Sequence, residues 1–270
     1  MFCECGACKK ARERGGKNVK MRSCTLLNDH ILIDMSPDIF AQSLRWGVRL
    51  SMVDHLILTH SHEDHLDPFA LYTRTKFGAT ILPDLPEERD RLNIYGNEEC
   101  KKVIDGAMDL NSNSHRSGRP ERSRICWQQM ELWKPVQVGE LTVVPLRANH
   151  KKGELCHIYG ITDGKSSLLY ANDTGALPED TWEHLEKIGL RFDLISLDCA
   201  RGTLPGDGHM GLKEACEVKR RLEQRGLAAE NARFCLNHFS HMCGLTPEEF
   251  EILAEKEGMT LASDGMIWEI

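Results

Sequence analysis

The sequence lacks any apolar run that approaches the ~20 residues needed to cross a bilayer, which disfavours a membrane-spanning protein. Its first residues contain no apolar stretch of the kind that a secretory signal peptide carries. Its 11 cysteines, without such a signal, indicate a reducing compartment in which thiols outnumber disulfides. We therefore expect a soluble, cytoplasmic protein with no membrane partner.

The chain also lacks an excess of positive charge. It has 34 lysine and arginine residues against 41 aspartate and glutamate residues, for a formal net charge of −7. Surfaces that bind nucleic acid are usually basic, so this balance disfavours nucleic acid as a partner. The segment nearest to a basic face is 115–124, part of a polar stretch over 111–124. A solvated loop is the favoured interpretation there, and a basic flap beside an anionic substrate is the alternative.

Neither a strong internal repeat nor a linker interrupts the 270 residues, which suffice for a sizeable core. We therefore expect a single domain over 1–270. Strand-like and helix-like stretches alternate along the chain, which predicts an α/β protein. The expected helices cover 36–46, 97–108, 179–188, 212–225 and 247–257. The expected strands cover 25–27, 31–33, 56–58, 141–146, 167–172, 194–197, 233–237 and 266–268, with hairpin turns at 28–29 and 163–164.

Histidines and acidic residues are concentrated in 59–65, Thr-His-Ser-His-Glu-Asp-His, directly after a short apolar run. On an extended stretch, side chains two residues apart point to the same side, so His60 and His62 can share one metal ion. Asp64 and His65 should begin the following helix and can point at a second ion. Imidazole is the commonest ligand for zinc-like ions, so this density favours a metal site over a solvated loop.

Three more candidate ligands stand where other apolar runs end. His150, Asp173 and His238 each lie just past a strand-like stretch. Loops that follow strands commonly carry binding and catalytic residues. These residues are therefore candidates to complete a metal centre.

This order of motifs resembles the metallo-β-lactamase-fold hydrolases, in which an HxHxDH motif is followed by a histidine, an aspartate and a final histidine. The resemblance spans roughly 24–270 and implies a four-layer αββα sandwich of two mixed β-sheets flanked by helices. It also implies two divalent metal ions, with zinc, manganese and iron as candidates. By the resemblance, one ion is held by His60, His62 and His150, the other by Asp64, His65 and His238, and Asp173 bridges both.

A second group of candidate ligands is Cys3, Cys5 and Cys8. Three thiols this close provide most of a structural zinc site, which still needs a fourth ligand. His241, three residues beyond the last ligand above, is the natural candidate. Together they resemble the phosphoribosyl 1,2-cyclic phosphate phosphodiesterase branch of the family, in which a cysteine triplet and a late histidine hold a structural zinc. We therefore expect a zinc-binding segment at about 1–10.

In that branch, His209 corresponds to a loop histidine that works at the scissile phosphate. Asp64 and His209 are accordingly the candidate catalytic residues. Two ions about 3.5–4 Å apart can hold a bridging hydroxide that attacks phosphorus. His209, on a glycine-flanked loop, could give a proton to the departing alkoxide, and a plain surface histidine is the alternative. The expected substrate is a small anionic phosphate ester, cyclic or diester.

Two departures from the branch bear on the substrate. The cysteine triplet follows directly on Met1 and Phe2, where family members have a strand and a glycine-rich loop, and 66–68 lacks the common glycine. The open alternatives are a lactone, β-lactam or thioester hydrolase, a tRNA-processing nuclease, and a non-catalytic accessory protein. A homodimer is a family expectation.

Other polar residues receive weaker assignments. Asp34 and Asp264 are candidates either for orienting ligand imidazoles or for capping turns. The remaining histidines have no companions at useful spacing, so we interpret them as structural. They are His30, His55, His115, His157 and His184.

Overall fold

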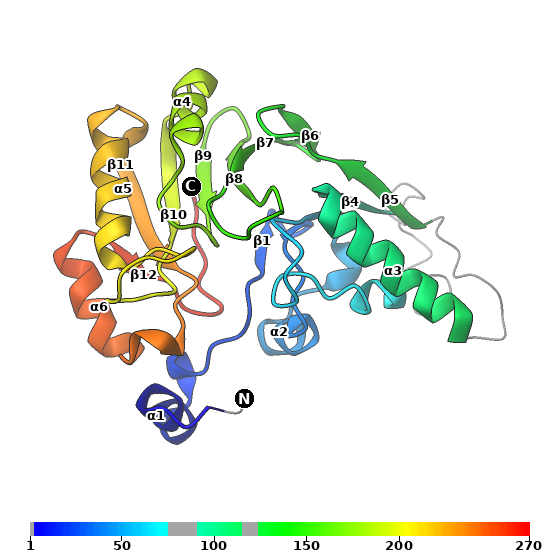
Figure 1. The fold of residues 1–270 in the computed structure, drawn as a ribbon, viewed down its shortest axis with the longest axis horizontal. Coiled ribbons are helices and arrows are strands. Elements are labelled where there is room, and N and C mark those ends of the chain that lie inside the picture. Colours follow the sequence, from blue (N-terminus) through cyan, green and yellow to red (C-terminus); the bar gives the residue numbers. More distant parts are fainter. Residues whose placement is uncertain (1–2, 75–90, 115–123) are drawn as a thin grey trace. The chain divides into compact units, whose positions relative to one another are not determined.

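The computed structural model describes residues 3–74, 91–114 and 124–270. It divides into two compact units (Figure 1). Met21–Glu131 form one of them, called the five-stranded unit. Met1–Lys20 and Leu132–Ile270 form the other, called the seven-stranded unit. The expectation of a single domain stays a prediction.

The five-stranded unit contains one mixed sheet with the strands in sequence order. The strands are β1 (Thr25–Leu27), β2 (Ile31–Ile33), β3 (His55–Ile57), β4 (Leu92–Gly96) and β5 (Ile125–Gln129). β1 and β2 pair antiparallel and the other neighbours pair parallel. Asn28 and Asp29 connect β1 to β2 with φ of 47° and 64°, left-handed values that Asn and Asp tolerate. The predicted hairpin is confirmed, whereas β4 and β5 were not predicted.

Two helices flank this sheet, α2 (Ile39–Trp46) and α3 (Glu98–Ser114). Their apolar residues share a core with Leu32, Leu56 and Ile94 of the strands. Gly47 ends α2 with φ 68°, as predicted. The helix begins at Ile39 and not at the predicted residue 36, because the Ser36 hydroxyl accepts from the Asp38 amide in the turn before the helix. α3 runs beyond its predicted end into the stretch expected to be a loop, and 115–123 lie outside the described residues.

The helix predicted to begin at Asp64 and His65 is wrong. Residues 63–65 form a turn, and the chain then pairs with the segment after β2. The amide of Met35 donates to the His65 carbonyl at 2.8 Å, and that of Asp67 donates to the Met35 carbonyl at 2.7 Å. Pro68 also disfavours a helical conformation for the residue before it. A 3₁₀ helix follows only at Ala70–Arg74.

The seven-stranded unit contains a second mixed sheet, ordered β12-β11-β10-β9-β8-β7-β6. Its strands are β6 (Val136–Val138), β7 (Leu141–Arg147), β8 (His157–Thr162), β9 (Ser167–Ala171), β10 (Phe192–Asp198), β11 (Ala228–Asn237) and β12 (Thr260–Leu261). β6 to β9 pair antiparallel, and β9 to β12 pair parallel. The parallel strands are joined by helices that cross over between them, so their carboxyl ends meet at one edge of the sheet.

The crossover helices are α4 (Glu179–Ile188), α5 (Leu212–Gln224) and α6 (Pro247–Lys256), as predicted within one residue (Figure 1). Thr246 caps α6 through a hydrogen bond from Glu249 N. Trp182, Leu222 and Phe250, one from each helix, are buried in the core of this unit. The class predicted from the sequence, two mixed sheets flanked by helices, is confirmed.

The strand predicted at 266–268 is wrong. That segment has no strand pairing, and Ile267 is 87% exposed. Gly265, with φ 81°, turns the chain just before it, and the last strand is the earlier β12. A helix that was not predicted, α1 (Gly6–Arg14), lies near the amino terminus.

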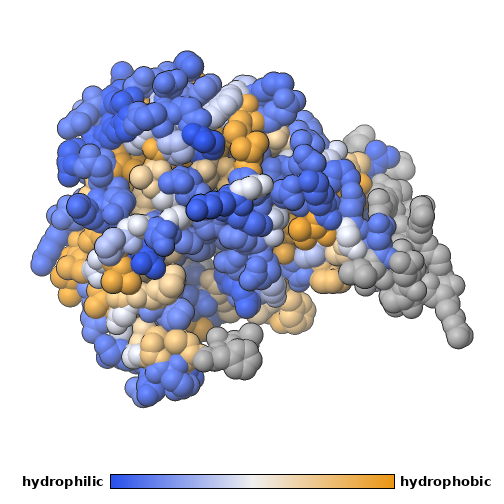
Figure 2. Space-filling model, in the orientation of Figure 1, coloured by the Kyte–Doolittle hydropathy of each residue, from blue (hydrophilic) through white to orange (hydrophobic). Residues whose placement is uncertain are grey.

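No helix among the described residues is both long enough and apolar enough to cross a membrane. On the face drawn in Figure 2, hydrophilic residues cover most of the surface and hydrophobic residues show in small separate areas. The apolar side chains are used mainly for the two cores.

Candidate metal centre

The histidine-rich stretch of the five-stranded unit leaves the carboxyl end of β3. His60 and His65 are completely buried, and His62 is half-buried. The Nε2 atom of His60 lies 2.9 Å from Nδ1 of His62, and the ring centroids of His60 and His65 are 4.4 Å apart. Asp64 Oδ2 lies 3.7 Å from Nε2 of His65. The motif thus gathers three imidazoles and a carboxylate as potential ligands.

One buried carboxylate, that of Asp34, supports this motif. It accepts hydrogen bonds from the amide and the hydroxyl of Thr59, at 2.9 to 3.0 Å. It also lies 2.7 Å from Nδ1 of His65, which leaves Nε2 of that ring for a ligand. These contacts favour the orienting role for Asp34 over turn capping. Asp264, the other candidate, is exposed in a turn after β12.

A second set of polar residues gathers at the strand ends of the seven-stranded unit. Asp173 follows β9, His238 follows β11, and His150 follows β7. Nε2 of His238 is 3.2 Å from Asp173 Oδ2, and Nε2 of His150 is 3.7 Å from Asp173 Oδ1. Nδ1 of His150 contacts the Gly208 carbonyl at 2.8 Å, which directs Nε2 toward Asp173. The sheet edge therefore brings together the three ligands predicted for this part of the chain.

His209 joins the same group through a residue that the sequence analysis missed, Asp198. Asp198 ends β10, is completely buried, and has Oδ2 2.9 Å from Nδ1 of His209. Its Oδ1 accepts from the amides of Ala200 and Met210, at 3.0 and 3.1 Å. The signal was present in the sequence, because Asp198 ends an apolar run just as Asp173 follows one.

Three residues of these two sets have left-handed backbone conformations. The φ values are 60° for Asp34, 50° for Asp173 and 56° for His238. Such values are uncommon outside glycine, cost of the order of 1 kcal/mol or more, and cluster at functional sites. The Asn237 side chain accepts from the His238 amide at 2.8 Å, which helps to hold that conformation. The backbone is strained where the candidate ligands are presented.

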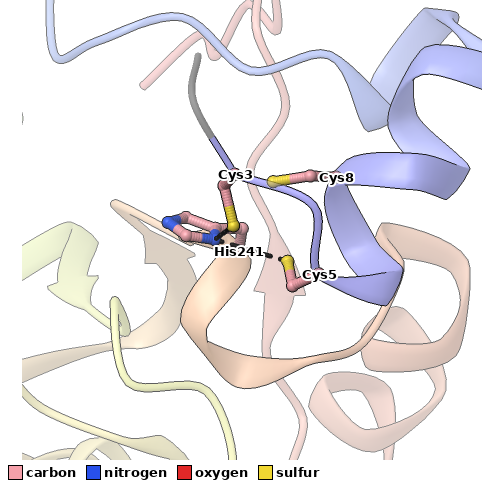
Figure 3. Close-up of side chains that lie close together, drawn as sticks. All are labelled: Cys3, Cys5, Cys8 and His241. Atoms are coloured by element: carbon pink, nitrogen blue, oxygen red, sulfur yellow. Dashed lines mark hydrogen bonds between the residues drawn. The ribbon is translucent and has the colours of Figure 1, made fainter.

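The cysteine triplet and His241 also come together, within the seven-stranded unit (Figure 3). The sulfurs of Cys3 and Cys5 each lie 3.5 Å from Nδ1 of His241. A tetrahedral zinc ion with bonds of ~2.3 Å to sulfur and ~2.1 Å to nitrogen has S–N separations of about 3.6 Å. One ligand atom from each of the four residues lies within 4.8 Å of the others. The chemistry and spacing of this donor set fit zinc.

Helix α1 explains how the short cysteine spacing presents its sulfurs. Cys5 is the residue just before α1 and Cys8 lies in its first turn. The Cys8 amide and, next, the His241 ring lower the pKa of the Cys5 thiol to about 6. Burial first, and then the neighbouring thiols, raise the pKa of Cys8 to about 11. Without an ion, these contacts stabilise the thiolate of Cys5, the form that binds metal, and disfavour that of Cys8.

The histidines interpreted as structural have local partners. His55 contacts the Tyr95 hydroxyl at 3.0 Å, and His184 stacks on Trp133 with centroids 3.9 Å apart. Burial lowers the pKa of His157 to about 4. His30 contacts the Asn28 carbonyl. His115 lies outside the described residues.

Residues 29–239 match the family model described as the beta-lactamase superfamily domain. No curated protein matches the sequence. Among solved structures, a diphosphatase from the PhnP family has 21% identity and a TM-score of 0.72, covering 100% of this chain and 91% of that chain. Zinc-bound PqqB from Methylobacterium extorquens has 13% identity and a TM-score of 0.63, covering 100% and 95%. Human tRNase Z, short form, has 15% identity and a TM-score of 0.60, covering 92% of both chains.

Proposed function

Because the chain belongs to the beta-lactamase superfamily domain family, we propose that it is a dinuclear metal-dependent hydrolase that cleaves a small phosphodiester, cyclic or acyclic. The observation that carries the phosphodiester assignment is the pair formed by His209 and Asp198, beside the candidate ligands Asp173 and His238. Cleavage of an ester requires a proton for the leaving oxygen, and a histidine held by a carboxylate beside the metal ligands can supply it.

The proposed ligand sets follow the family pattern. They are His60, His62 and His150 for one ion, Asp64, His65 and His238 for the other, and Asp173 for both. Bound divalent ions, zinc, manganese or iron, would supply a nucleophile at neutral pH and neutralise charge on the phosphoryl oxygens. Cys3, Cys5, Cys8 and His241 are proposed to hold a structural zinc ion.

His209 is proposed to move the proton. Its Nδ1 lies 2.9 Å from Asp198 Oδ2, so this nitrogen carries the hydrogen of that bond and Nε2 is left for the substrate. The Asp198 carboxylate stabilises the protonated ring and fixes its orientation. Because Asp198 also accepts from the Met210 amide, the loop that carries His209 is held at the same point.

Phosphoanhydride hydrolysis is the second candidate. A structurally similar protein is named as a diphosphatase of the PhnP family, and a diphosphate presents the same doubly substituted phosphorus to the metal centre. The similarity to a tRNA-processing enzyme is lower, and the net charge of −7 disfavours an RNA substrate. Lactones, β-lactams and thioesters are the carbon-centred alternatives, and the substrate panel separates them from the phosphorus candidates.

A substrate panel on protein reconstituted with zinc, manganese or iron tests the proposal. Aryl and cyclic phosphodiesters should exceed lactones and β-lactams by orders of magnitude, and a diphosphate ester in the panel decides between the two phosphorus candidates. His209→Ala should lose about 10²–10⁴-fold in turnover with both active-site ions retained. His184→Ala, a half-buried histidine elsewhere in the same unit, is the matched control and should keep full activity.

Elemental analysis supplies the second arm of the test. Protein purified without chelator should carry two ions at the histidine–aspartate centre and one zinc ion at the cysteines. One ion per chain with no gain on reconstitution would exclude the dinuclear reading. Loss of metal in His209→Ala, or retention of full turnover, would exclude its role as the acid.

A further inference from the structure

We propose that the zinc ion assigned to the cysteines and His241 controls the position of the His209 acid, and that Gly202 is the positioning residue through which it acts. The segment concerned is the loop 199–211 between β10 and α5, called the acid loop. The inference rests on the proposed function and deepens it, because it assigns a control to the acid and not to the active-site metal ligands.

The two limbs of the acid loop are joined beside His209. The Arg201 amide donates to the Met210 carbonyl at 3.2 Å, and the Leu212 amide donates to the Gly202 carbonyl at 2.7 Å. Met210 follows His209 directly in the chain. A shift of Gly202 therefore reaches the backbone of the acid through two hydrogen bonds.

Gly202 packs directly on the short 3₁₀ helix that carries His241. This helix, His241–Cys243, is called the His241 helix. A Cβ added at Gly202 would lie 1.9 Å from Cβ and 3.2 Å from Cα of Cys243, a separation that no side chain can adopt without a shift of the chain. Gly202 also has φ 56°, a left-handed value that glycine adopts readily. Glycine at this position thus lets the acid loop and the His241 helix meet backbone to backbone.

The cysteine site holds the other side of the His241 helix (Figure 3). Nδ1 of His241 lies 3.5 Å from the sulfurs of Cys3 and Cys5, and the residue is exposed. Cys243, two residues later, is 8% exposed and belongs to the core of the seven-stranded unit. The core therefore fixes the inner side of the helix, and a zinc ion would fix its outer side. Loss of the ion should loosen the helix and, with it, the contact at Gly202.

The acid loop is anchored mainly at its ends. Its middle part, residues 203–207, is exposed. One anchor is Asp198, which accepts the Met210 amide at 3.1 Å. The other is the His241 helix, which the loop meets at Gly202 and, through the Ala200 carbonyl, at the hydroxyl of the preceding serine. If the second anchor loosens, Asp198 alone holds the loop, and His209 is free to move from its place beside the metal ligands.

A displaced acid has a specific effect on catalysis. An alkoxide is a poor leaving group and needs the proton that His209 supplies, whereas a nitrophenolate leaves readily without it. Loss of the zinc at the cysteines should therefore slow the cleavage of alkyl esters more than that of nitrophenyl esters. Weaker binding of the active-site metals would slow both to the same extent.

Hydrogen exchange of the full chain, measured by mass spectrometry, tests the coupling without any substrate. Elemental analysis first establishes that the unsubstituted protein carries the zinc and that Cys8→Ser has lost it. Peptides from the acid loop should exchange about tenfold faster in Cys8→Ser, as expected for a local opening. Peptides from the hairpin between β8 and β9, at 163–166, should exchange at the same rate in both proteins.

A double-mutant cycle identifies the contact that carries the coupling. Gly202→Ala should open the acid loop with the zinc still bound, and the further change Cys8→Ser should then have little additional effect. Gly226→Ala is the matched control, because Gly226 has φ 66° and an added Cβ would meet no described atom within 4 Å. It introduces the same backbone strain without the contact, so the acid loop should stay closed and the effect of Cys8→Ser should persist.

Thermal unfolding shows whether Gly202→Ala is folded. If it is not, the comparison of Cys8→Ser with the unsubstituted protein still decides whether the zinc holds the acid loop. Turnover supplies the last measurement. With the active-site metals saturated, Cys8→Ser should lower the turnover of an alkyl phosphodiester about tenfold more than that of a nitrophenyl phosphodiester.

Four outcomes would overturn the inference. They are an unsubstituted protein without zinc at the cysteines, equal exchange of the acid loop in Cys8→Ser and the unsubstituted protein, additive effects of Gly202→Ala and Cys8→Ser, and equal losses of turnover for the two esters. A lack of phosphodiesterase activity in the unsubstituted protein would instead overturn the proposed function. The exchange measurements would then still decide whether the zinc and the acid loop are coupled.

Discussion

Asp34 in the five-stranded unit and Asp198 in the seven-stranded unit are both completely buried, and each carboxylate lies against Nδ1 of one histidine. Their remaining acceptor capacity is used differently. Asp34 accepts the amide and hydroxyl of Thr59, the first residue of the histidine-rich motif. Asp198 accepts the amides of Ala200 and Met210, at the two ends of a loop. One aspartate supports a contiguous motif, and the other closes a loop around the candidate acid.

The two sets of candidate ligands therefore differ in the number of structural elements that position them. The candidate ligands between His60 and His65 lie on one short turn, so a single support can position all of them. Asp173 and His238 leave separate strands, so the sheet positions each one independently. We therefore expect one substitution to lower stability and metal affinity strongly at the motif, and single substitutions around the second set to have smaller effects.

The largest effect is expected for Asp34→Ala. The change leaves the donors of Thr59 unsatisfied in a buried place and removes the carboxylate that orients His65. Breaking a buried charged group in this way costs about 3–5 kcal/mol. Loss of a residue that orients a metal ligand typically lowers metal affinity about 10–100-fold. Denaturant unfolding and zinc titration measure the two effects.

Asp34→Asn is the matched control for that variant. Asparagine tolerates the φ of 60° at this position and keeps an oxygen that can accept from Thr59. It should therefore be less destabilised than the alanine variant. Unchanged metal affinity in Asp34→Ala would mean that the turn, and not this carboxylate, orients His65.

The same two aspartates show which parts of the site could be predicted from the sequence. Asp34 was noticed because it follows an apolar run, although its role stayed open between orientation and capping. Asp198 was missed although it also ends an apolar run. Neither aspartate's partners could be predicted, because Thr59 and His65 lie 25 and 31 positions from Asp34 and His209 lies 11 positions from Asp198, so these contacts depend on tertiary structure.

The helices and strands show the same difference between local signals and tertiary contacts. Helices α4, α5 and α6 were predicted within one residue, because amphipathic periodicity and caps such as Thr246 are local signals. The turn at 63–65 was predicted as a helix, because the pairing of Met35 with the segment after the motif cannot be seen in the sequence. The strand predicted at 266–268 failed because an apolar run forms a strand only where a sheet edge receives it.

His157 is a buried imidazole that contacts a phenol and not a carboxylate. Its Nδ1 lies 3.3 Å from the Tyr159 hydroxyl. Burial lowers its pKa to about 4, whereas an unfolded histidine titrates near 6.5. The unfolded chain therefore binds the proton more tightly, and stability should fall as the pH drops from about 6.5 to 4. At 1.36 kcal/mol per pH unit, the free energy of unfolding should fall by about 3 kcal/mol over this range.

Denaturant unfolding at a series of pH values measures this effect. His157→Gln removes the titrating group, so its stability should depend less steeply on pH below about 6.5 than that of the unsubstituted protein. Above pH 7 the two pH profiles should run parallel. Equal slopes below pH 6.5 would mean that His157 is protonated in the folded protein without penalty.

A third means of holding an imidazole is the zinc proposed at the cysteines. His238 is assigned to the active-site ions and His241 to that zinc, so one short loop is tethered at both ends. Cys8→Ser should release the zinc and weaken the ion bound by His238 about tenfold, which corresponds to about 1.4 kcal/mol. The ion assigned to His60, His62 and His150 should be less affected.

Metal titration of the folded variant tests this coupling. Cys216→Ser, which replaces a half-buried thiol on α5 of the same unit, is the control and should leave every ion in place. Equal affinities in Cys8→Ser and the unsubstituted protein would show that the zinc and the active-site ions are independent.

The smallest effect is expected for Ser240→Ala, in the same loop. The Ser240 hydroxyl donates to the Ala200 carbonyl at 2.8 Å, and the Ala200 amide donates to Asp198. This chain of contacts connects the loop of His238 to the aspartate beside the candidate acid. The hydroxyl also accepts from the Met242 amide at 3.2 Å, an exposed contact that water can replace. The hydrogen bond to Ala200 contributes about 1 kcal/mol, and the sheet still positions His238, so we expect a loss of about that size and a metal affinity within a few-fold.

Ser43→Ala is the matched control for this last change. The Ser43 hydroxyl also donates to a backbone carbonyl, that of Phe40 at 2.9 Å, but on exposed helix α2. Because water can replace an exposed hydrogen bond, Ser43→Ala should cost less than Ser240→Ala. A loss in Ser240→Ala as large as that in Asp34→Ala, with metal affinity lowered as much, would mean that the second ligand set also depends on a single support. The contrast between the two aspartates would then not hold.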